Sequence, residues 1–294
     1  MVVFIESGRL GNQLFQYAAL RALTLDRGER VVLLGFSELA DVFDGVEATI
    51  IARPSIAIRG LMRFRGTIDA LFTRMPFVGL ISSVPGEPKR ALKIRAAGIG
   101  GLSYGLLDWF DSGGSFTPES IASLQVKPAL LDWAREMLAR AENGPRPRVF
   151  VHVRRGDFLH WPSVEHPAVL PASWYRQMMT LMRTKYRDPL FVFVTDDVPY
   201  VLAEFGESDG FVISAGGSAQ DFAVMTLCDG GILSASTYSW WGALFASRQN
   251  RSACFVGPLH WDLHPLGTGE GPRSTHHHIE YIAVSSLQSV VADA

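Results

Sequence analysis

The sequence predicts an α/β protein of two halves, each built on a parallel sheet that helices cover on both faces. Short β-branched and aromatic runs alternate with segments whose apolar residues recur at helical spacing, which is the pattern of such sheets. A stretch rich in Pro and Gly at 143–147 interrupts the alternation, and a new strand pattern follows it. The 294 residues are enough for two halves of ordinary domain size. We therefore expect one domain over 1–145 and a second over 146–294.

The first half opens with a strand, a loop and a helix. Val2–Ile5 is a β-branched and aromatic run, and a loop that contains glycines follows at 7–11. Apolar residues at helical spacing predict a helix over 12–26, and Val31–Leu34 reads as the next strand. This order predicts a β-loop-α-β unit.

The second half continues the alternation. Ligands of open parallel sheets bind beyond the carboxyl ends of the strands, so functional residues are expected in the loops that follow the strands. The expected strands are 149–153, 190–194, 211–213, 231–234 and 253–256, and the expected helices lie near 173–186, from 197, near 219–227 and at 239–246.

The composition is that of an ordinary globular protein. Hydrophobic residues make up 48% and charged residues 19%, and the formal net charge of -2 favours no nucleic-acid partner. The two cysteines, Cys228 and Cys254, form at most one bridge, which fits a reducing compartment. The opening residues lack a signal-peptide pattern, and no run of about 18 apolar residues follows. We expect a soluble, cytoplasmic protein.

One basic segment departs from this neutrality. Between Arg53 and Arg95, nine basic residues stand against Asp69 and Glu87, a combination that fits an anionic lipid or glycan surface. An ordinary solvated surface around apolar anchors is the alternative, and the sequence favours it. The basic residues are Arg53, Arg59, Arg63, Arg65, Arg74, Lys89, Arg90, Lys93 and Arg95, and the anchors are Leu61, Met62, Phe64, Leu71, Phe72 and Phe77.

The strongest functional pattern is the strand end at 149–157, where two arginines, a glycine and an aspartate follow an apolar run. Arginine presents a planar fork of donors that suits phosphate, so Arg154 or Arg155 is expected to neutralise a diphosphate leaving group. Neighbouring side chains on a strand face opposite ways, and only one of the two is expected to do so directly. The alternative is that both arginines pair with carboxylates such as Asp157 and merely close the strand.

A second pattern is the turn at 7–13, whose glycines let the backbone approach a ligand while helix-start amides face an anion. Its spacing matches neither the dinucleotide fingerprint nor the P-loop. The alternative is a tight turn with Asn12 as helix N-cap.

Two further strand ends carry polar groups. Asp196 and Asp197 follow the strand at 190–194, where they are expected to bind a guanine edge or a ribose, or Asp197 simply caps the next helix. The segment 231–242 offers hydroxyls suited to phosphate, with Trp240 and Trp241 as core or sugar-stacking residues.

Metal dependence finds little support in the sequence. No two aspartates are separated by a single residue, so the Asp-x-Asp pattern that holds a divalent ion on a nucleotide diphosphate is absent. Histidines at 260–264 and 276–278 alternate or cluster, but no Cys or further carboxylate cluster stands near them. We expect arginine to neutralise the leaving group without a metal or other cofactor.

Together these segments resemble glycosyltransferase family 11, the α-1,2-fucosyltransferases, and in particular its bacterial members. The motifs, in the family's order, are GRLGNQLFQYAAL at 8–20, HVRRGD at 152–157, VTDD at 194–197 and DFAVMTLCDGGILSASTYSWWGALFA at 221–246. The resemblance implies a GT-B architecture of two Rossmann-like halves with a cleft between them. It implies metal-independent, inverting transfer of L-fucose from GDP-fucose, bound by the second half, to the 2-hydroxyl of a terminal galactose on the acceptor side, the first half.

The resemblance also implies roles for individual residues. Arg154 corresponds to the main catalytic residue, which contacts the β-phosphate, and Asp157 supports it. Asn12, beside Gly11, lies near the fucose and phosphate. The remaining donor-site residues are Arg155, His152, Asp196 at the guanine, and Ser236, Thr237 and Tyr238 around the diphosphate.

The catalytic base and the acceptor stay open. Glu6, Asp157, Asp221 and a β-phosphate oxygen are candidate bases. The implied acceptor is a galactose-terminated oligosaccharide or a lipid-linked glycan, because bacterial members often modify O-antigen or capsule precursors at the cytoplasmic membrane face. Peripheral membrane contact is therefore an alternative to a freely soluble protein. Phe158 stands where the family has tyrosine, so another linkage or GDP-sugar, or a non-catalytic glycan-binding relative, is the alternative function.

Overall fold

The computed structural model describes residues 1–51, 63–83, 91–96, 101–106, 117–141, 144–161, 163–164, 167–206, 210–259 and 279–284. The chain divides into two compact units, Met1–Lys127 and Pro128–Ala294. The sequence predicted this division at residue 145, but in the structure it lies earlier. The reason is that helix α5 (Pro128–Ala141) packs on helix α8 (Ser218–Thr226) of the second unit. Trp133 of α5 also packs against Gly216, where an added Cβ would lie 2.8 Å from the indole ring.

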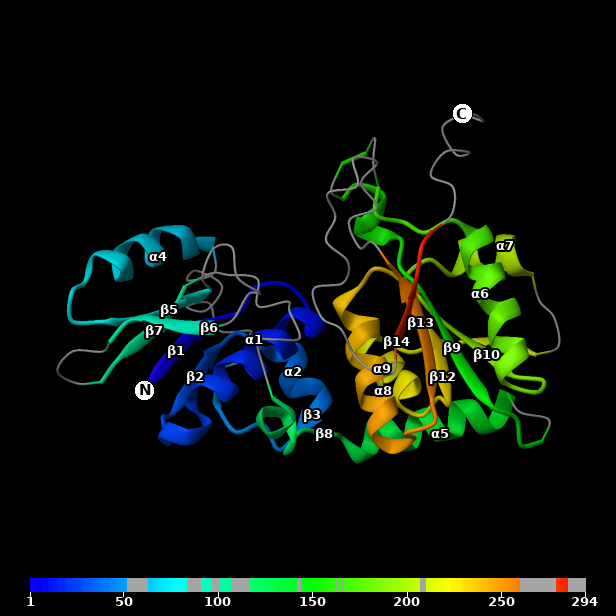
Figure 1. Cartoon of the computed structure of the whole chain (residues 1–294), viewed down its shortest axis with the longest axis horizontal. Helices are drawn as coiled ribbons and strands as arrows, with labels where there is room; N and C mark the ends of the chain where they lie inside the picture. Colours follow the sequence, from blue (N-terminus) through cyan, green and yellow to red (C-terminus); the bar gives the residue numbers. More distant parts are fainter. Residues whose placement is uncertain are drawn as a thin grey trace. The chain divides into compact units, whose positions relative to one another are not determined.

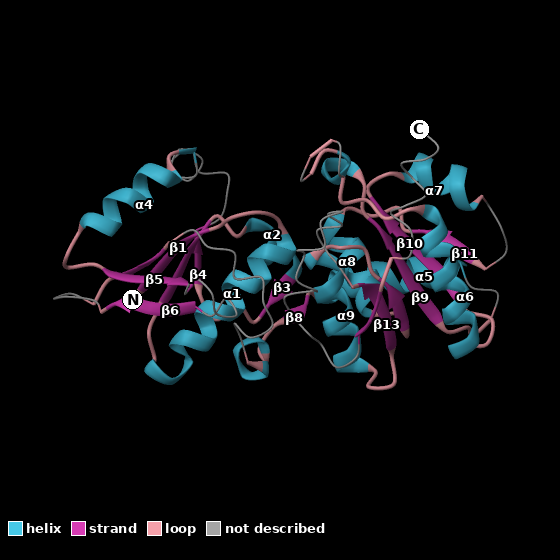
Figure 2. Ribbon diagram, turned by 45° about the horizontal axis from the view of Figure 1, so that its top comes forward, coloured by secondary structure: helices cyan, strands magenta, loops and turns pink. Residues whose placement is uncertain are grey.

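The first unit is built on a six-stranded sheet in the order β4-β2-β1-β7-β5-β6, drawn in magenta in Figure 2. Neighbouring strands are parallel except β5 and β6, and a short antiparallel pair joins β3 to β8. The strands are β1 (Val2–Ile5), β2 (Val31–Leu34), β3 (Phe43–Asp44), β4 (Thr49–Ile51), β5 (Gly79–Ser83), β6 (Ala91–Arg95), β7 (Ser103–Gly105) and β8 (Gln125–Val126). The helices are α1 (Leu10–Thr24), α2 (Ser37–Val42) and α4 (Arg65–Arg74), with 3-10 turns η1 (Leu25–Arg27) and η3 (Pro118–Ile121).

Helix α1 follows β1 after a short loop at 6–9, as the sequence predicted, and is buried along most of its length. It begins at Leu10 with Arg9 at the N-cap, so Asn12 lies in its first turn and the N-cap interpretation of Asn12 is wrong. Gly8, before the helix, has a φ of +81°. An added Cβ there would lie 2.4 Å from the Asn12 amide nitrogen, so glycine is required for Asn12 to lie against this loop.

The second unit is built on a wholly parallel sheet in the order β11-β10-β9-β12-β13-β14. The strands and helices predicted for this half are confirmed, with ends shifted by a few residues. The strands are β9 (Arg148–Val153), β10 (Leu190–Thr195), β11 (Phe211–Ile213), β12 (Gly230–Ile232), β13 (Cys254–Pro258) and β14 (Ile279–Ile282). The other helices are α6 (Ala172–Lys185), α7 (Val198–Phe205) and α9 (Thr237–Gln249), with a 3-10 turn η4 (Gly156–Leu159).

Both faces of this sheet are covered, which explains the unbroken apolar runs of its strands. Figure 1 shows α6 and α7 on one face and α8 and α9 on the other. Val149 and Val151 of β9 belong to the core cluster that includes Trp174 of α6. Phe150, between them, points to the opposite face and lies against Phe255 of β13.

Helix α9 is buried because its apolar side chains face the core on nearly all sides. Trp240 and Trp241 have almost no exposed surface, so the core interpretation of the two tryptophans is confirmed and the sugar-stacking one is wrong. Gly242 allows α9 to approach α8, since an added Cβ would lie 2.9 Å from the Met225 methyl group. No helix in the described ranges is long and apolar enough to cross a membrane.

The strand order of the second sheet reverses beside β9. From β9 the chain runs outward to β10 and β11, and then returns to β12 on the other side of β9. In sheets of this kind the crevice at such a reversal, beyond the carboxyl ends of the strands, binds ligands. The ends of β9, β10 and β12 are therefore where this fold places a site.

Candidate active site

Arg154 is the first polar residue beyond β9, and two carboxylates hold it. Its guanidinium lies 2.6 Å from Oδ2 of Asp196 and also pairs with Asp157 of η4. Its side chain is 15% exposed, and its guanidinium carbon lies 5.4 Å from the centre of the Phe158 ring. The side chain is thus held in one place while part of it remains open to a ligand.

Arg155 is held separately from Arg154. Its Nε lies 3.0 Å from Oδ2 of Asp197, and its guanidinium carbon lies 3.6 Å above the Tyr200 ring. Asp197 also caps α7, because its carboxylate accepts a hydrogen bond from the backbone N–H of Tyr200. The helix-cap interpretation of Asp197 is therefore confirmed, and Arg155 is fixed by groups that stabilise α7.

Asp196 connects β10 to β9. Its Oδ2 pairs with Arg154, and its Oδ1 accepts a hydrogen bond of 2.9 Å from the backbone N–H of Arg155. Gly156 makes room for it, since an added Cβ would lie 2.5 Å from Oδ2 of Asp196. Both oxygens of the residue expected to read guanine therefore contact the loop that carries the two arginines.

His152 lies on β9 beside the strand reversal and is 5% exposed. Its Nδ1 lies 2.7 Å from the hydroxyl of Ser234, which follows β12, and its ring centre lies 5.4 Å from that of Tyr238. Burial, and to a lesser degree the charge of Arg154, lowers the pKa of His152 to about 3. At neutral pH the imidazole is therefore uncharged, and it serves as a hydrogen-bonding group rather than as a cation.

The start of α9 supplies the predicted hydroxyl residues. Ser236 is the N-cap, and its hydroxyl accepts a hydrogen bond of 3.3 Å from the backbone N–H of Tyr238. The Tyr238 hydroxyl donates to the carbonyl of Ser218 at the start of α8, so that side chain ties the two helix starts together. Thr237 is the first residue of the helix and is partly buried. Helix-start amides of this kind favour an anion.

Asp221 lies in the first turn of α8 and is buried. Its Oδ1 accepts a hydrogen bond from the hydroxyl of Ser214, which follows β11. Burial raises the pKa of Asp221 to about 7, and the hydrogen bond from Ser214 only partly opposes this rise. The carboxyl group is therefore about half protonated at neutral pH, unlike an ordinary surface aspartate.

The remaining predicted residues belong to the first unit. Gly11 is buried in the first turn of α1, and Asn12 lies one residue further along the same turn. Glu6, at the end of β1, is buried, and its carboxylate accepts a hydrogen bond of 2.7 Å from Nε2 of Gln13. The structure therefore assembles the predicted residues in two sets, one beyond β1 and one beyond β9, β10 and β12.

The described residues offer little to a metal ion. Among them no group of three His, Cys, Asp or Glu side chains is close enough to hold one. The histidines at 260–264 and 276–278, whose spacing makes them candidate metal ligands, lie outside the described residues.

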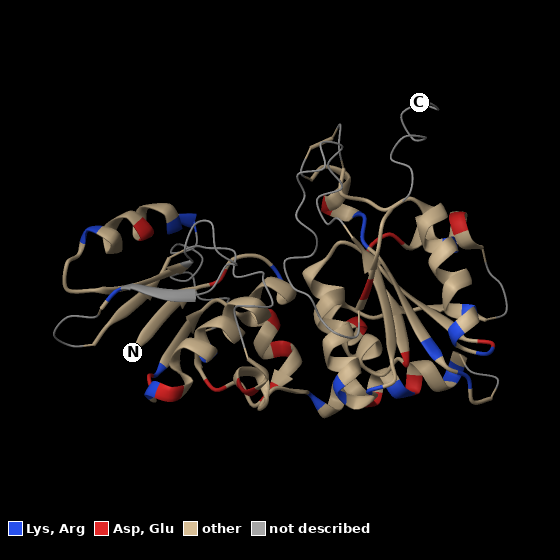
Figure 3. Cartoon of the chain, in the orientation of Figure 1, with Lys and Arg blue, Asp and Glu red and all other residues tan. Residues whose placement is uncertain are grey.

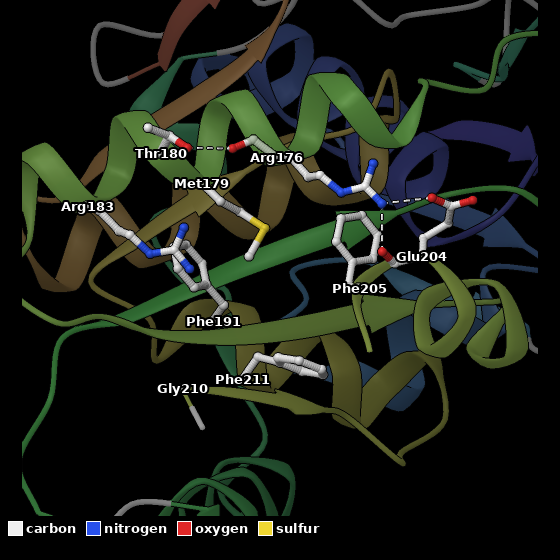
Figure 4. A pocket seen from close by; sticks show the side chains of 9 residues that line it. All are labelled: Arg176, Met179, Thr180, Arg183, Phe191, Glu204, Phe205, Gly210 and Phe211. Atoms are coloured by element: carbon white, nitrogen blue, oxygen red, sulfur yellow. Dashed lines mark hydrogen bonds and ion pairs between the residues drawn. The ribbon is translucent and has the colours of Figure 1, made fainter. Parts of the chain in front are cut away.

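A pocket of about 290 Å³ lies elsewhere in the second unit, between α6, the end of α7 and the start of β10 and β11. Figure 4 shows Arg176 paired with Glu204 at its rim and Arg183 over the Phe191 ring. Phe191 precedes Asp196 by about 16 Å along β10, so this pocket opens at the other end of the strand. It shares no residue with the arginine cluster.

The site residues of the second unit lie in a stretch of the chain that matches a known protein family. The model of glycosyl transferase family 11 covers residues 116–253. This stretch is homologous to glycosyl transferase family 11. The family 11 stretch contains every predicted site residue of the second unit, from His152 to Tyr238, whereas Gly11 and Asn12 lie outside it.

Relatives of known activity extend the similarity. Galactoside α-(1,2)-fucosyltransferase 2 of Sus scrofa is 33% identical over 112 residues, which are 35% of this chain and 33% of that protein. Galactoside α-(1,2)-fucosyltransferase 1 of Ateles belzebuth is 28% identical over 262 residues, which are 81% of this chain and 63% of that protein. The chain thus spans about a third of the length of the first relative and less than two thirds of the second.

A solved structure bears on the fold alone. The glycosyl transferase family 9 protein of Veillonella parvula DSM 2008 superposes with a TM-score of 0.53 at 10% identity, over 96% of this chain and 85% of that one. The predicted fold class, α/β with two parallel-sheet units as in GT-B glycosyltransferases, is confirmed.

Sequence reasoning missed three supporting residues of the second unit. Tyr200 under Arg155, Ser214 against Asp221, and the direct contact of Ser234 with His152 were not expected. Tyr200 had a usable signal, because a capping aspartate accepts a hydrogen bond from the backbone N–H of the third residue after it. That hydrogen bond keeps Tyr200 close to Asp197, the partner of Arg155. The contacts of Ser214 and Ser234 depend on which strands lie side by side, and local patterns do not contain that information.

Proposed function

We propose that this chain is a galactoside 2-α-L-fucosyltransferase, which transfers L-fucose from GDP-fucose to the 2-hydroxyl of a terminal galactose with inversion and without a metal. The observation that carries the proposal is Arg154, held by two carboxylates at the strand reversal and within the family 11 stretch. In this proposal the second unit binds GDP-fucose, the first unit receives the acceptor glycan, and Asn12 acts near the fucose and the phosphate.

Arg154 acts on the leaving group. As the bond between fucose C1 and the β-phosphate oxygen breaks, its electron pair stays on GDP, and the guanidinium donors of Arg154 stabilise the developing charge. The backbone N–H groups at the start of α9, around Thr237, add a second source of positive potential. One preorganised donor of this kind contributes roughly 3 kcal/mol to transition-state stabilisation.

The charges around Arg154 determine how the phosphate enters. Two arginines pair with three carboxylates, those of Asp157, Asp196 and Asp197. A diphosphate that binds this cluster therefore competes with one of these carboxylates for an arginine. Asp196 is anchored by the backbone of Arg155, and Asp197 caps α7, whereas the Asp157 side chain is 64% exposed. The phosphate therefore replaces Asp157 on Arg154, while Asp196 keeps the guanidinium in position.

Asp157 is also the candidate base that we favour. Once the phosphate has displaced it, its carboxylate is exposed, unpaired with Arg154 and adjacent to the leaving group, where it can accept the proton of the attacking hydroxyl. Asp221 is less suitable because it is buried, hydrogen-bonded to Ser214 and largely protonated below neutral pH. The proton otherwise goes to a β-phosphate oxygen.

The decisive experiment compares Arg154→Ala with Arg176→Ala. Arg176 is also ion-paired, to Glu204, and lies 5.3 Å from a phenylalanine ring centre, but it sits at the pocket rim away from the cluster. Fucose transfer to a β-galactoside is expected to fall at least a hundredfold in Arg154→Ala and to persist in Arg176→Ala. Equal activity of the two variants would remove Arg154 from the mechanism.

The donor and the linkage are tested separately. Calorimetric titration in EDTA is expected to show selective binding of GDP over ADP and UDP. A galactoside that lacks the 2-hydroxyl is expected to receive no fucose, and fucosylation of that acceptor would show another linkage. GDP release without transfer to any galactoside would instead indicate a non-catalytic or hydrolytic relative.

We further propose that the enzyme is of the bacterial type and acts in the cytoplasm on O-antigen or capsule precursors. The motif resemblance supports this setting, in which the acceptor is an oligosaccharide or a lipid-linked glycan. Transfer rates to one galactosylated oligosaccharide, free and attached to a polyprenyl diphosphate carrier, test the choice between the two acceptors.

A further inference from the structure

Helix α4 of the first unit is fixed to the sheet by one face. Phe72 stacks on Tyr104 of β7, with ring centres 4.2 Å apart, and the Tyr104 hydroxyl donates a hydrogen bond of 2.8 Å to Asp69. Arg65 is buried on the same side, where its guanidinium contacts the carbonyl oxygens of Ile5 and Glu6. These contacts determine which side of α4 faces outward.

The outward side carries large apolar side chains. Phe64, just before the helix, is 60% exposed, and Leu71, two turns further along the same flank, is 52% exposed. Phe77, shortly after the helix, is 59% exposed. Exposed apolar residues that occur singly are ordinary, but three within fourteen positions, on and beside one helix, mark an interaction surface.

Positive charge accompanies these apolar residues. Arg63 and Arg74 lie at the two ends of α4, and Figure 3 shows blue at both ends of that helix. The acidic residue of the helix, Asp69, is turned toward Tyr104 and Arg65. The outward side of α4 therefore combines aromatic and aliphatic groups with arginine and carries no acidic residue.

We propose that Phe64, Leu71, Phe77, Arg63 and Arg74, here called the α4 surface, dock on an anionic phospholipid bilayer. A basic amphipathic helix of this kind lies in the membrane interface, with its apolar residues at the level of the headgroups and its arginines on lipid phosphates. The charge of the surrounding sequence, seven more basic than acidic residues between Arg53 and Arg95, complements such a membrane. A second copy of this surface would bring arginines against arginines and is disfavoured.

The biological role of this docking rests on the proposed function. A transferase held at the bilayer by its acceptor-binding unit meets lipid-linked glycans in two dimensions, so the α4 surface favours the lipid-linked acceptor over the free oligosaccharide. Binding of the bilayer itself does not depend on fucose transfer, and the two can therefore be tested apart.

The test is sedimentation of the full chain with vesicles of phosphatidylcholine alone and of phosphatidylcholine with phosphatidylglycerol. We expect the chain to bind only the anionic vesicles and to be released as the salt concentration rises. Arg63→Gln/Arg74→Gln is expected to lower the partition coefficient roughly thirtyfold, and Phe64→Ser/Leu71→Ser on the order of tenfold or more.

Matched controls lie on the second unit. Arg135→Gln/Arg140→Gln removes two exposed arginines of α5, and Val198→Ser/Leu202→Ser removes two exposed apolar residues of α7. Both controls are expected to bind vesicles like the parent chain. Equal losses in the controls and the α4 variants, equal binding to neutral and anionic vesicles, or no binding of the parent chain would each overturn the proposal. A dimer in analytical ultracentrifugation that Phe64→Ser/Leu71→Ser abolishes would also overturn it.

Transfer to a soluble galactoside separates this proposal from the enzymatic one. The α4 variants are expected to keep that activity at the parent level, which also shows that they fold. Vesicle binding by a chain that transfers no fucose would leave the docking surface standing and remove the enzymatic proposal. Fucose transfer by a chain that binds no vesicles would overturn the docking proposal and leave the enzymatic proposal standing.

Discussion

The carboxylate of Asp196 joins the ends of two neighbouring strands, because one oxygen lies 2.6 Å from the guanidinium of Arg154 and the other accepts the backbone N–H of Arg155. Asp196 is thus bound to the loop it positions at two points, whereas Asp157 contacts Arg154 from an exposed turn. The two carboxylates should therefore respond to substitution in opposite ways.

Replacing Asp196 with Asn is expected to lower kcat strongly and to change the KM for GDP-fucose less. The amide can still accept the backbone hydrogen bond but loses the ion pair that aims Arg154, so stabilisation of the transition state suffers more than ground-state binding. Steady-state kinetics at varied GDP-fucose concentration measure the split. A change confined to KM would show that Asp196 contributes only to donor binding, as a guanine contact does.

Replacing Asp157 with Asn is expected to tighten GDP binding several-fold, because the phosphate no longer competes with a carboxylate for Arg154. The same variant is expected to lose kcat if Asp157 accepts the proton of the acceptor hydroxyl. Calorimetric titration with GDP and a transfer assay read the two effects separately. Weaker GDP binding would contradict the exchange of Asp157 for phosphate, whatever happens to kcat.

Asp221 and His152 give the stability of the fold opposite dependences on pH. The pKa of Asp221 is raised to about 7, so its contribution is complete below its ordinary pKa near 3.8 and is lost as the pH rises to about 7. The pKa of His152 is lowered to about 3, so its contribution is complete above about 6.5 and is lost as the pH falls. In the parent chain the two effects partly cancel between pH 4 and 6.5.

Asp221→Asn is expected to expose the His152 effect. Relative to the parent, the variant should gain stability steadily as the pH rises from about 4 to 7. Urea unfolding at four pH values measures the difference, with Asp132→Asn, an exposed aspartate of α5, as the control. Parallel pH profiles of Asp221→Asn and the parent chain would show that burial does not perturb this carboxyl group.

The sequence predicted most of the second unit because its strands are buried on both faces and therefore appear as unbroken apolar runs. The HVRRGD motif also located the arginine cluster, since strand ends in parallel sheets are where ligands bind. The contacts that the site residues make with one another were harder to predict. Asp196 was expected to face guanine, but its contact with Arg154 depends on β10 lying next to β9, and the pairing of strands is a tertiary fact.

The first unit was harder to predict for a physical reason. Several of its strands have only two or three residues, such as β4 (Thr49–Ile51) and β7 (Ser103–Gly105), and so short a run shows no periodicity. Arg65 was counted among the basic surface residues because it lies in the segment 53–95, where nine basic residues stand against two acidic ones. Its burial follows from the position of α4 beside β1, which the local sequence does not reveal.

Arg65→Met is expected to destabilise the first unit by roughly 2 to 4 kcal/mol, because it leaves the buried carbonyl oxygens of Ile5 and Glu6 without their donor. Burial lowers the pKa of Arg65, but an arginine stays charged, so Asp69 also loses its buried partner in this variant. Arg63→Met, an exposed arginine two positions away, serves as the control and is expected to unfold within about 0.5 kcal/mol of the parent. Urea denaturation of both variants distinguishes a buried structural arginine from a member of the α4 surface. Equal midpoints would show that Arg65 is an ordinary solvated residue, as the sequence suggested.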